Sequence, residues 1–269
     1  MTRRSRAAAT LALVLGTSGC ASALKEPPPI AELQRAALAP ASADDLVAEG
    51  RTSYARRPDV AAVRKAEELC LAAAQADETG EAGVEGLTCA IQAKAWLLER
   101  GGLASGRAAV AVSAVQAGQW CLRRAPESAA CRYWLAVALG LQSREKPTTA
   151  EDGVRRMVAL LREVARTDPA LDEAGPERIL ALLLLRAPGW PLGPGDSGEG
   201  LSLARKAVAL RPGYPPNDLA LAEALEKTGD PKAARLALGQ ALESARAALE
   251  AGNPDASAWV REAESRLRR

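Results

Sequence analysis

Apolar residues recur every three or four positions along most of this 269-residue chain. Val60, Val63 and Ala66 show this spacing in one segment, and Trp134 and Val137 show it in another. The spacing places apolar side chains on one face of an α-helix, whereas the alternation expected of a half-buried strand is nowhere sustained. Ala, Leu, Arg and Glu are abundant and Phe is absent, a composition that favours helices. The pattern predicts an all-α protein from residue 43 onward.

Proline and glycine interrupt this pattern at intervals and so indicate where helices end. Proline cannot continue a helix, and glycine commonly follows a helix end. The interruptions fall at Arg57-Pro58, Gly101-Gly102, Ala125-Pro126, Lys146-Pro147, Asp168-Pro169, 189–195, 212–216, 229–231 and Asn253-Pro254. They predict about ten or eleven helices in antiparallel succession.

Four of the prolines are regularly spaced. Pro126, Pro169 and Pro212 are separated by 43 residues each, and Pro254 follows after 42. Each proline follows a helical segment of similar sequence, which is typical of solenoids built from helix pairs. We therefore expect an all-α, right-handed solenoid of about five antiparallel helix pairs over residues 43–269.

The clearest unit, residues 217–241, resembles a tetratricopeptide repeat (TPR). Leu221, Ala222 and Leu225 occupy that motif's first-helix positions, and Gly229 ends the helix. The second-helix positions are Ala234, Leu238 and Ala241. Small residues suit these positions because two helices approach closely only where a side chain is small. The observed period exceeds the roughly 34 residues usual for this repeat, which indicates longer helices or insertions.

The first 19 residues have the layout of a secretory signal, with Arg3, Arg4 and Arg6 before an apolar run and small residues after it. Small residues directly before Cys20 resemble the lipobox of bacterial lipoproteins, although Thr17 stands where an aliphatic residue is usual. The resemblance implies cleavage after residue 19 and a lipid on Cys20. The alternative is an ordinary cleaved signal with a chance cysteine. Residues 20–42, which include three consecutive prolines, are predicted to be a flexible tether.

The net charge of the chain indicates which classes of partner it can bind. Removing three arginines with the signal changes 35 basic and 33 acidic residues to 32 and 33, a net charge of −1. A nearly neutral chain argues against nucleic acid as a partner. Membrane contact is therefore expected through acyl chains. Ala21 is not the Asp that retains some lipoproteins at the inner membrane, which favours the periplasmic face of the outer membrane.

Four cysteines remain in the predicted mature body. We expect the disulfides Cys70–Cys89 and Cys121–Cys131, because each pair would join two antiparallel helices and an exported protein meets oxidising conditions. The alternative is four buried thiols that act as small apolar residues. A zinc site is disfavoured because the chain has no histidine and no Cys-x-x-Cys pair.

The sequence offers little for catalysis. Without histidine there is no Ser-His-Asp or Cys-His arrangement, and the glycine-rich words lack a phosphate loop's Lys-Ser/Thr. We predict no enzymatic activity, no metal and no cofactor. A histidine-free enzyme acting on glycans is the alternative, and it would need two carboxylates facing one concavity beside exposed tryptophan.

Five residues are candidates for binding a protein partner. Trp190 lies in a loop with three prolines, where it could serve as an anchor or cover the end of a hairpin. The first helices of TPR folds line the concave face, which makes Tyr133, Asn217 and Glu223 candidates for groove contacts, and Tyr214 is a similar case. For the tyrosines and the asparagine, packing within the fold is the favoured alternative.

Three stretches together resemble the T-component lipoproteins associated with TRAP transporters. They are DDLVAEG at 44–50 with Tyr54, YWLAVALG at 133–140, and APGWPLGPG at 187–195 leading into PNDLALAE at 216–223. The resemblance implies a helical periplasmic lipoprotein that partners a solute-binding protein and assembles as a trimer around a central opening. The alternative function is a scaffold lipoprotein for an envelope complex, such as pilus, secretion or outer-membrane protein machinery.

Overall fold

The computed structural model describes residues 22–33 and 41–269. Over these residues the chain forms eleven α-helices and two short 3-10 helices, with no strand, so the all-α prediction is confirmed. The α-helices are α1 (Ala43–Ala55), α2 (Val60–Ala76), α3 (Glu81–Glu99), α4 (Arg107–Arg124), α5 (Ala129–Glu145), α6 (Ala150–Thr167), α7 (Leu171–Arg186), α8 (Ser197–Leu210), α9 (Pro215–Lys227), α10 (Pro231–Glu250) and α11 (Ala256–Leu267).

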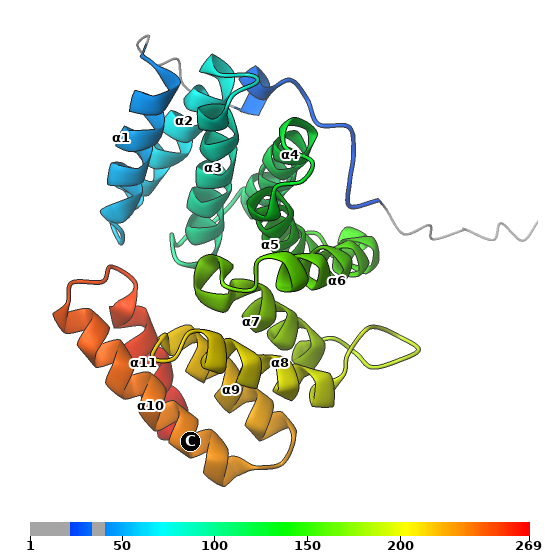
Figure 1. The fold of residues 1–269 in the computed structure, drawn as a ribbon, viewed down its shortest axis with the longest axis vertical. Coiled ribbons are helices and arrows are strands. Elements are labelled where there is room, and N and C mark those ends of the chain that lie inside the picture. Colours follow the sequence, from blue (N-terminus) through cyan, green and yellow to red (C-terminus); the bar gives the residue numbers. More distant parts are fainter. Residues whose placement is uncertain (1–21, 34–40) are drawn as a thin grey trace, which may run out of the picture.

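The helices form two layers. Each odd-numbered helix contacts the next odd-numbered helix, whereas an even-numbered helix contacts no α-helix other than its two neighbours in sequence. The odd-numbered helices therefore form one continuous layer of the helical solenoid, and the even-numbered helices pack against it. Figure 1 shows the solenoid curling until the turn between α10 and α11 comes close to the end of α1.

The regularly spaced prolines mark the repeat as predicted. Pro126, Pro169 and Pro212 each lie two residues after the end of α4, α6 and α8, and Pro254 lies in the turn after α10. The intervals between them therefore hold the pairs α5–α6, α7–α8 and α9–α10. The 43-residue period exceeds that of a typical TPR because of long helices such as α6 and because of the long connection between α7 and α8.

Small residues allow the close helix crossings expected of the repeat. Ala222 on α9 and Ala241 on α10 are fully buried, and they share one apolar cluster with Leu225, Leu238 and Trp259. This cluster joins α11 to the last helix pair. A larger cluster runs from α2 to α7 and forms the core of the first two thirds of the chain.

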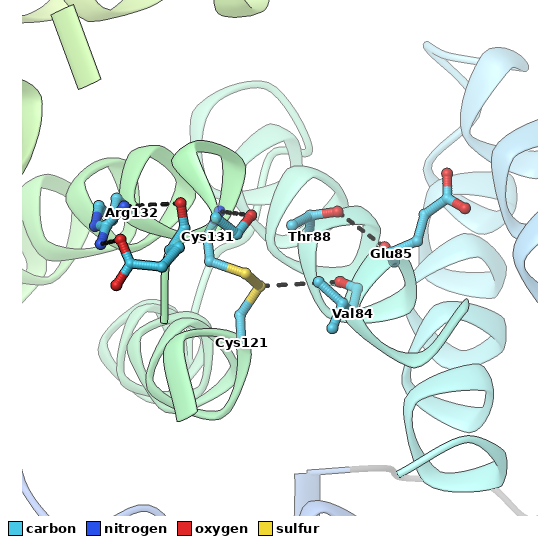
Figure 2. The surroundings of a disulfide bond; sticks show 8 residues. Val84, Glu85, Thr88, Cys121, Cys131 and Arg132 are labelled. Carbon is cyan, nitrogen blue, oxygen red and sulfur yellow. Dashed lines mark hydrogen bonds and ion pairs between the residues drawn. A yellow bond between two sulfur atoms is a disulfide. The ribbon is translucent and has the colours of Figure 1, made fainter. Parts of the chain in front are cut away.

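Two disulfides join neighbouring helices of the core with the predicted pairings. Cys70 of α2 bonds to Cys89 of α3, and Cys121 of α4 bonds to Cys131 of α5, with Cα–Cα distances of 5.8 and 5.4 Å. Figure 2 shows the second disulfide beside α3, where the Cys121 sulfur lies 3.9 Å from the carbonyl oxygen of Val84. Each bond closes one helical hairpin.

Residues 22–33 lie against the folded body, although the sequence predicts a flexible tether over 20–42. The backbone N–H of Ala23 donates to Asp152 at the start of α6, over 2.9 Å. The Trp120 indole of α4 donates to the carbonyl oxygen of Pro28 over 2.8 Å, and Ile30 is buried. These contacts correct the prediction for this part of the segment, because the proline-rich stretch supplies carbonyl acceptors and apolar surface to the body.

Candidate functional site

Aromatic and charged side chains from the odd-numbered helices, and from the turns beside them, contact one another across helix boundaries. They come from segments far apart in the sequence but adjacent through the odd-numbered helices. The set comprises Tyr54, Arg57, Trp96, Tyr133, Asp172, Arg178, Tyr214, Asn217, Asp255 and Trp259.

Asp255 connects the two ends of the solenoid. It directly precedes α11, and its Oδ2 accepts hydrogen bonds from Arg57 Nε and Nη2 over 3.2 and 3.0 Å. Its Oδ1 accepts from the Trp96 indole over 3.2 Å. One carboxylate therefore joins the last helix to the α1–α2 connection and to α3, and it turns the solenoid into a closed ring. We call these contacts of Asp255, Arg57 and Trp96 the seam.

A pocket of about 410 Å³ lies beside the seam. Its walls come from the end of α1, from one face of α3 and from the α10–α11 turn. The lining residues are Arg51, Tyr54, Ala55, Arg57, Glu85, Thr88, Cys89, Gln92, Gly252 and Pro254. Guanidinium, amide, hydroxyl and carboxylate groups thus surround one concavity, which can accept a polar segment through several hydrogen bonds.

The charges in the pocket are largely paired. Arg51 forms an ion pair with Glu85, and Arg57 is paired with Asp255 and lies 3.9 Å over the Tyr54 ring. Burial raises the pKa of Tyr54 to about 12; Arg57 opposes this increase, while Asp255 adds to it. The Tyr54 hydroxyl therefore stays protonated at neutral pH and can donate a hydrogen bond.

The first residues of α7 have an unusual backbone. Asp172, Glu173 and Ala174 have φ angles of 48°, 55° and 62°. The left-handed conformation costs roughly 1–2 kcal/mol per residue other than glycine. Such strain persists only where surrounding contacts fix the conformation.

Three buried side chains supply those contacts. Arg178 donates to the Asp172 carboxylate over 2.9 Å and to the Glu173 carbonyl oxygen over 2.9 Å. Asn217 of α9 accepts from Arg178 and donates to the same Glu173 carbonyl. Tyr133 of α5 donates to the Asp172 carboxylate, and burial raises its pKa well above the usual value, so that it remains a donor. The strained turn thus links α5, α7 and α9.

A solved TPR structure has the same architecture as this chain. The crystal structure of TTC0263, a thermophilic TPR protein in Thermus thermophilus, aligns with 84% of this chain and 100% of its own, at 19% identity and a TM-score of 0.57. This chain has a TPR-like fold. The crystal structure of the MamA protein aligns with 77% of this chain and 94% of its own, at 14% identity and a TM-score of 0.45. No protein-family model and no curated protein sequence matches the chain.

The TPR-like fold buries two of the residues predicted to contact a partner. Tyr133 and Asn217 are both 0% exposed and are used in holding the strained turn. They cannot reach a partner's surface, so the prediction is wrong for these two, and the alternative of packing within the fold is correct. Tyr214 is half-buried and packs edge-on against Trp259, with ring centroids 5.5 Å apart.

The other two predicted residues stay accessible but lie apart from the pocket. Glu223 of α9 accepts two hydrogen bonds of 2.7 Å from Arg186 of α7. Trp190 is 91% exposed in the α7–α8 connection. Cys20 and the predicted signal lie outside the described residues.

Sequence reasoning missed the residues that make the seam. Arg57 and Asp255 are 198 positions apart, and neither belongs to a motif. The one available signal was that each lies beside a predicted helix break, at Arg57-Pro58 and Asn253-Pro254, where loops at the end of a helix pair are exposed to new contacts.

Two further properties concern ligands and membranes. Within residues 22–33 and 41–269, no group of three His, Cys, Asp or Glu side chains is placed to hold a metal ion. None of the helices in this part of the chain is both long and apolar enough to span a bilayer.

Proposed function

We propose that this chain is a non-catalytic lipoprotein adaptor, anchored through Cys20 at the periplasmic face of the outer membrane, and that it binds a protein partner at the seam pocket. The observation that carries the proposal is the polar pocket between the two ends of a closed, TPR-like ring. TPR-like folds present such concave surfaces to protein segments.

The chemistry of the pocket supports binding over catalysis. Glycoside hydrolysis requires two carboxylates on either side of the scissile bond. The pocket wall has one carboxylate, Glu85, which forms an ion pair with Arg51. Because its pKa is raised, the Tyr54 hydroxyl stays protonated at neutral pH, so it donates a hydrogen bond and does not act as a general base. These groups suit recognition of a partner's backbone and polar side chains.

Export to an oxidising compartment is supported by the two disulfides. The lipid anchor rests on the signal-like residues 1–19 and the small residues before Cys20. Changing Cys20→Ser should release the protein from membranes or leave it unprocessed. If this variant fractionated with membranes as wild type does, Cys20 would not be the lipid anchor.

For the partner, we favour the solute-binding protein of a TRAP-type transporter, on the strength of the resemblance of residues 44–50, 133–140, 187–195 and 216–223 to T-component lipoproteins. We also propose that the chain assembles as a trimer, because the same resemblance implies one. The alternative partner is an assembly machine of the envelope for pili, secretion or outer-membrane proteins.

The test is affinity capture of the tagged lipoprotein after extraction in mild detergent, followed by mass spectrometry. Gln92→Arg would place a bulky charge in the pocket wall, and Gln240→Arg makes the same change at an exposed position on α10. We expect a solute-binding protein to co-purify with wild type and with Gln240→Arg, but not with Gln92→Arg. If only components of an assembly machine co-purified, the partner would be that machine rather than a transporter. If both variants recovered the partner equally, the pocket would not be its binding site.

A further inference from the structure

The connection between α7 and α8, residues 187–196, presents two large apolar side chains to solvent. Trp190 is 91% exposed and Leu192 is 84% exposed, the highest values among the large hydrophobic side chains in the described part of the chain. No charged residue occurs from 187 to 195. Exposed apolar residues gathered in this way usually mark a contact surface. The seam pocket does not include them.

The loop is closed by its own backbone. Gly195 N–H donates to the Pro188 carbonyl oxygen over 2.8 Å, and Leu192 N–H donates to the Gly189 carbonyl oxygen over 3.0 Å. A Cβ on Gly195 would come within 2.2 Å of the Ala187 carbonyl oxygen, so the close approach requires glycine. A loop ordered in this way loses little conformational entropy when its tip is buried by a partner.

The contacts of the N-terminal segment indicate which part of the folded body lies near the predicted lipid anchor. Ser22, the first described residue, follows the predicted lipid attachment point Cys20 by two positions in the sequence. Ser22 and Ala23 contact Asp152 at the start of α6. A lipid on Cys20 would therefore hold the membrane close to the start of α6.

Helix α6 also contacts the region of the α7–α8 loop. Arg162, ten residues further along α6, pairs with Glu199 at the start of α8, which directly follows the loop. Ten helical residues span about 15 Å. In Figure 1 the α7–α8 loop and the described start of the N-terminal segment both lie on the right-hand side of the molecule. A membrane held by Cys20 is thus within reach of the loop tip.

The composition of this edge also suits a membrane. Tryptophan with an adjacent aliphatic residue is typical of the boundary between lipid headgroups and acyl chains. Arg155 and Arg162 on α6 are ion-paired with Asp152 and Glu199, so the apolar pair Trp190 and Leu192, rather than a free positive charge, suits this edge to a membrane.

We propose that the tip of the 187–196 loop, with Trp190 and Leu192, inserts into the bilayer surface as a second membrane contact beside the lipid on Cys20. The proposal rests on the proposed anchor. Two contacts at one edge fix the orientation of the ring, whereas attachment through Cys20 alone leaves it free to rotate. The closed ring then stands with the α6–α8 edge on the membrane.

The experiment uses the full lipoprotein, purified from membranes and reconstituted into phosphatidylethanolamine–phosphatidylglycerol vesicles whose acyl chains carry bromine. Bromine quenches tryptophan only at close range. Trp190 is one of five tryptophans, so we expect quenching of about a fifth of the emission, absent in Trp190→Ala. Leu192→Ala should reduce the quenching, while Leu236→Ala, which removes an exposed leucine from α10, should not.

Equal quenching in wild type and Trp190→Ala would overturn the proposal. If Trp190→Ala also lost a protein that co-purifies with wild type, while its quenching by lipid equalled that of wild type, the loop would bind a protein rather than the membrane. Mass spectrometry of the N-terminal peptide tests acylation separately. If Cys20 carries no lipid, the anchor fails, and the same quenching comparison on the unacylated protein mixed with vesicles decides whether the loop alone binds lipid.

Discussion

Asp255 is the residue through which the last helix meets the first part of the chain, and changing it to alanine tests whether the seam closes the ring. The side chain accepts two hydrogen bonds from Arg57 and one from Trp96. Although Asp255 directly precedes α11, its side chain makes no capping bond, so the substitution removes seam contacts without removing a helix cap.

The size of the effect follows from burial. The side chains of Arg57 and Asp255 are 14% and 20% exposed, so water screens their attraction only in part. Hydrogen bonds to a charged group contribute more than neutral ones, and the Arg57 and Trp96 donors would lose their acceptor. We expect Asp255→Ala to lower the free energy of unfolding by about 2–3 kcal/mol. In a double-mutant cycle with Arg57→Ala we expect a coupling of about 1–2 kcal/mol.

The assay is urea denaturation followed by circular dichroism, together with amide hydrogen exchange. Because α11 contacts α9 and α10 but no helix of the first pair, losing the seam should raise exchange in α1 and α11 before the rest of the chain. The control is Glu250→Ala, an exposed acidic residue at the end of α10, with an expected change within about 0.5 kcal/mol. If Asp255→Ala matched this control in both stability and exchange, the seam would not be what closes the ring.

Three other changes test the interior. Replacing Cys70 and Cys89 with alanine should cost about 3 kcal/mol, from the entropy of a loop with a sequence separation of 19, and an unchanged urea midpoint would contradict this. Lys94→Ala should cost about 3–5 kcal/mol because it leaves the buried carboxylate of Glu67 without its ion-pair partner; adding Glu67→Leu should recover part of the loss, and no recovery would refute the argument. Burial raises the pKa of Asp218 to about 6 from 3.8, so ionisation lowers stability as pH rises from about 4 to 6. Asp218→Asn should therefore be more stable than wild type by about 1–2 kcal/mol at pH 7.5, and this difference should be lost at pH 4. Thermal melts of both proteins at the two pH values measure the difference, and an equal difference at both would contradict the prediction.

The helices and their breaks could be predicted because they depend on local chemistry. Pro126, Pro169 and Pro212 remove a backbone donor and so end helices wherever they occur. The turn between α2 and α3, at residues 77–80, has no proline and was implied only by the cysteine pair on either side of it. The disulfide pairing itself followed from geometry, since each pair joins two consecutive helices.

The site could not be predicted in the same way, because it depends on where the solenoid ends meet. The pairing of Arg57 with Asp255 depends on the accumulated curvature of all the helix pairs between them. The left-handed turn at Asp172 depends on Tyr133 and Asn217, which lie on other helices. A sequence pattern reports the face of a helix but not which tertiary partner it will meet.

The prediction about residues 20–42 shows how tertiary contacts override composition. A proline-rich stretch was expected to be flexible, but the Pro28 carbonyl accepts from Trp120, and Ala23 is 2% exposed. Trp120, which donates this hydrogen bond, is a half-buried side chain that packs against the core.

The central claim is that a protein partner binds at the seam pocket, and photo-crosslinking in living cells tests it most directly. A photoreactive amino acid would replace Gln92 in the pocket wall, and Gln240 on the outer helix α10 would serve as the matched position. The account predicts a discrete crosslinked protein from position 92 and none from position 240, with the adduct lost when Asp255→Ala opens the seam. No adduct at position 92, or the same adduct from both positions, would contradict it.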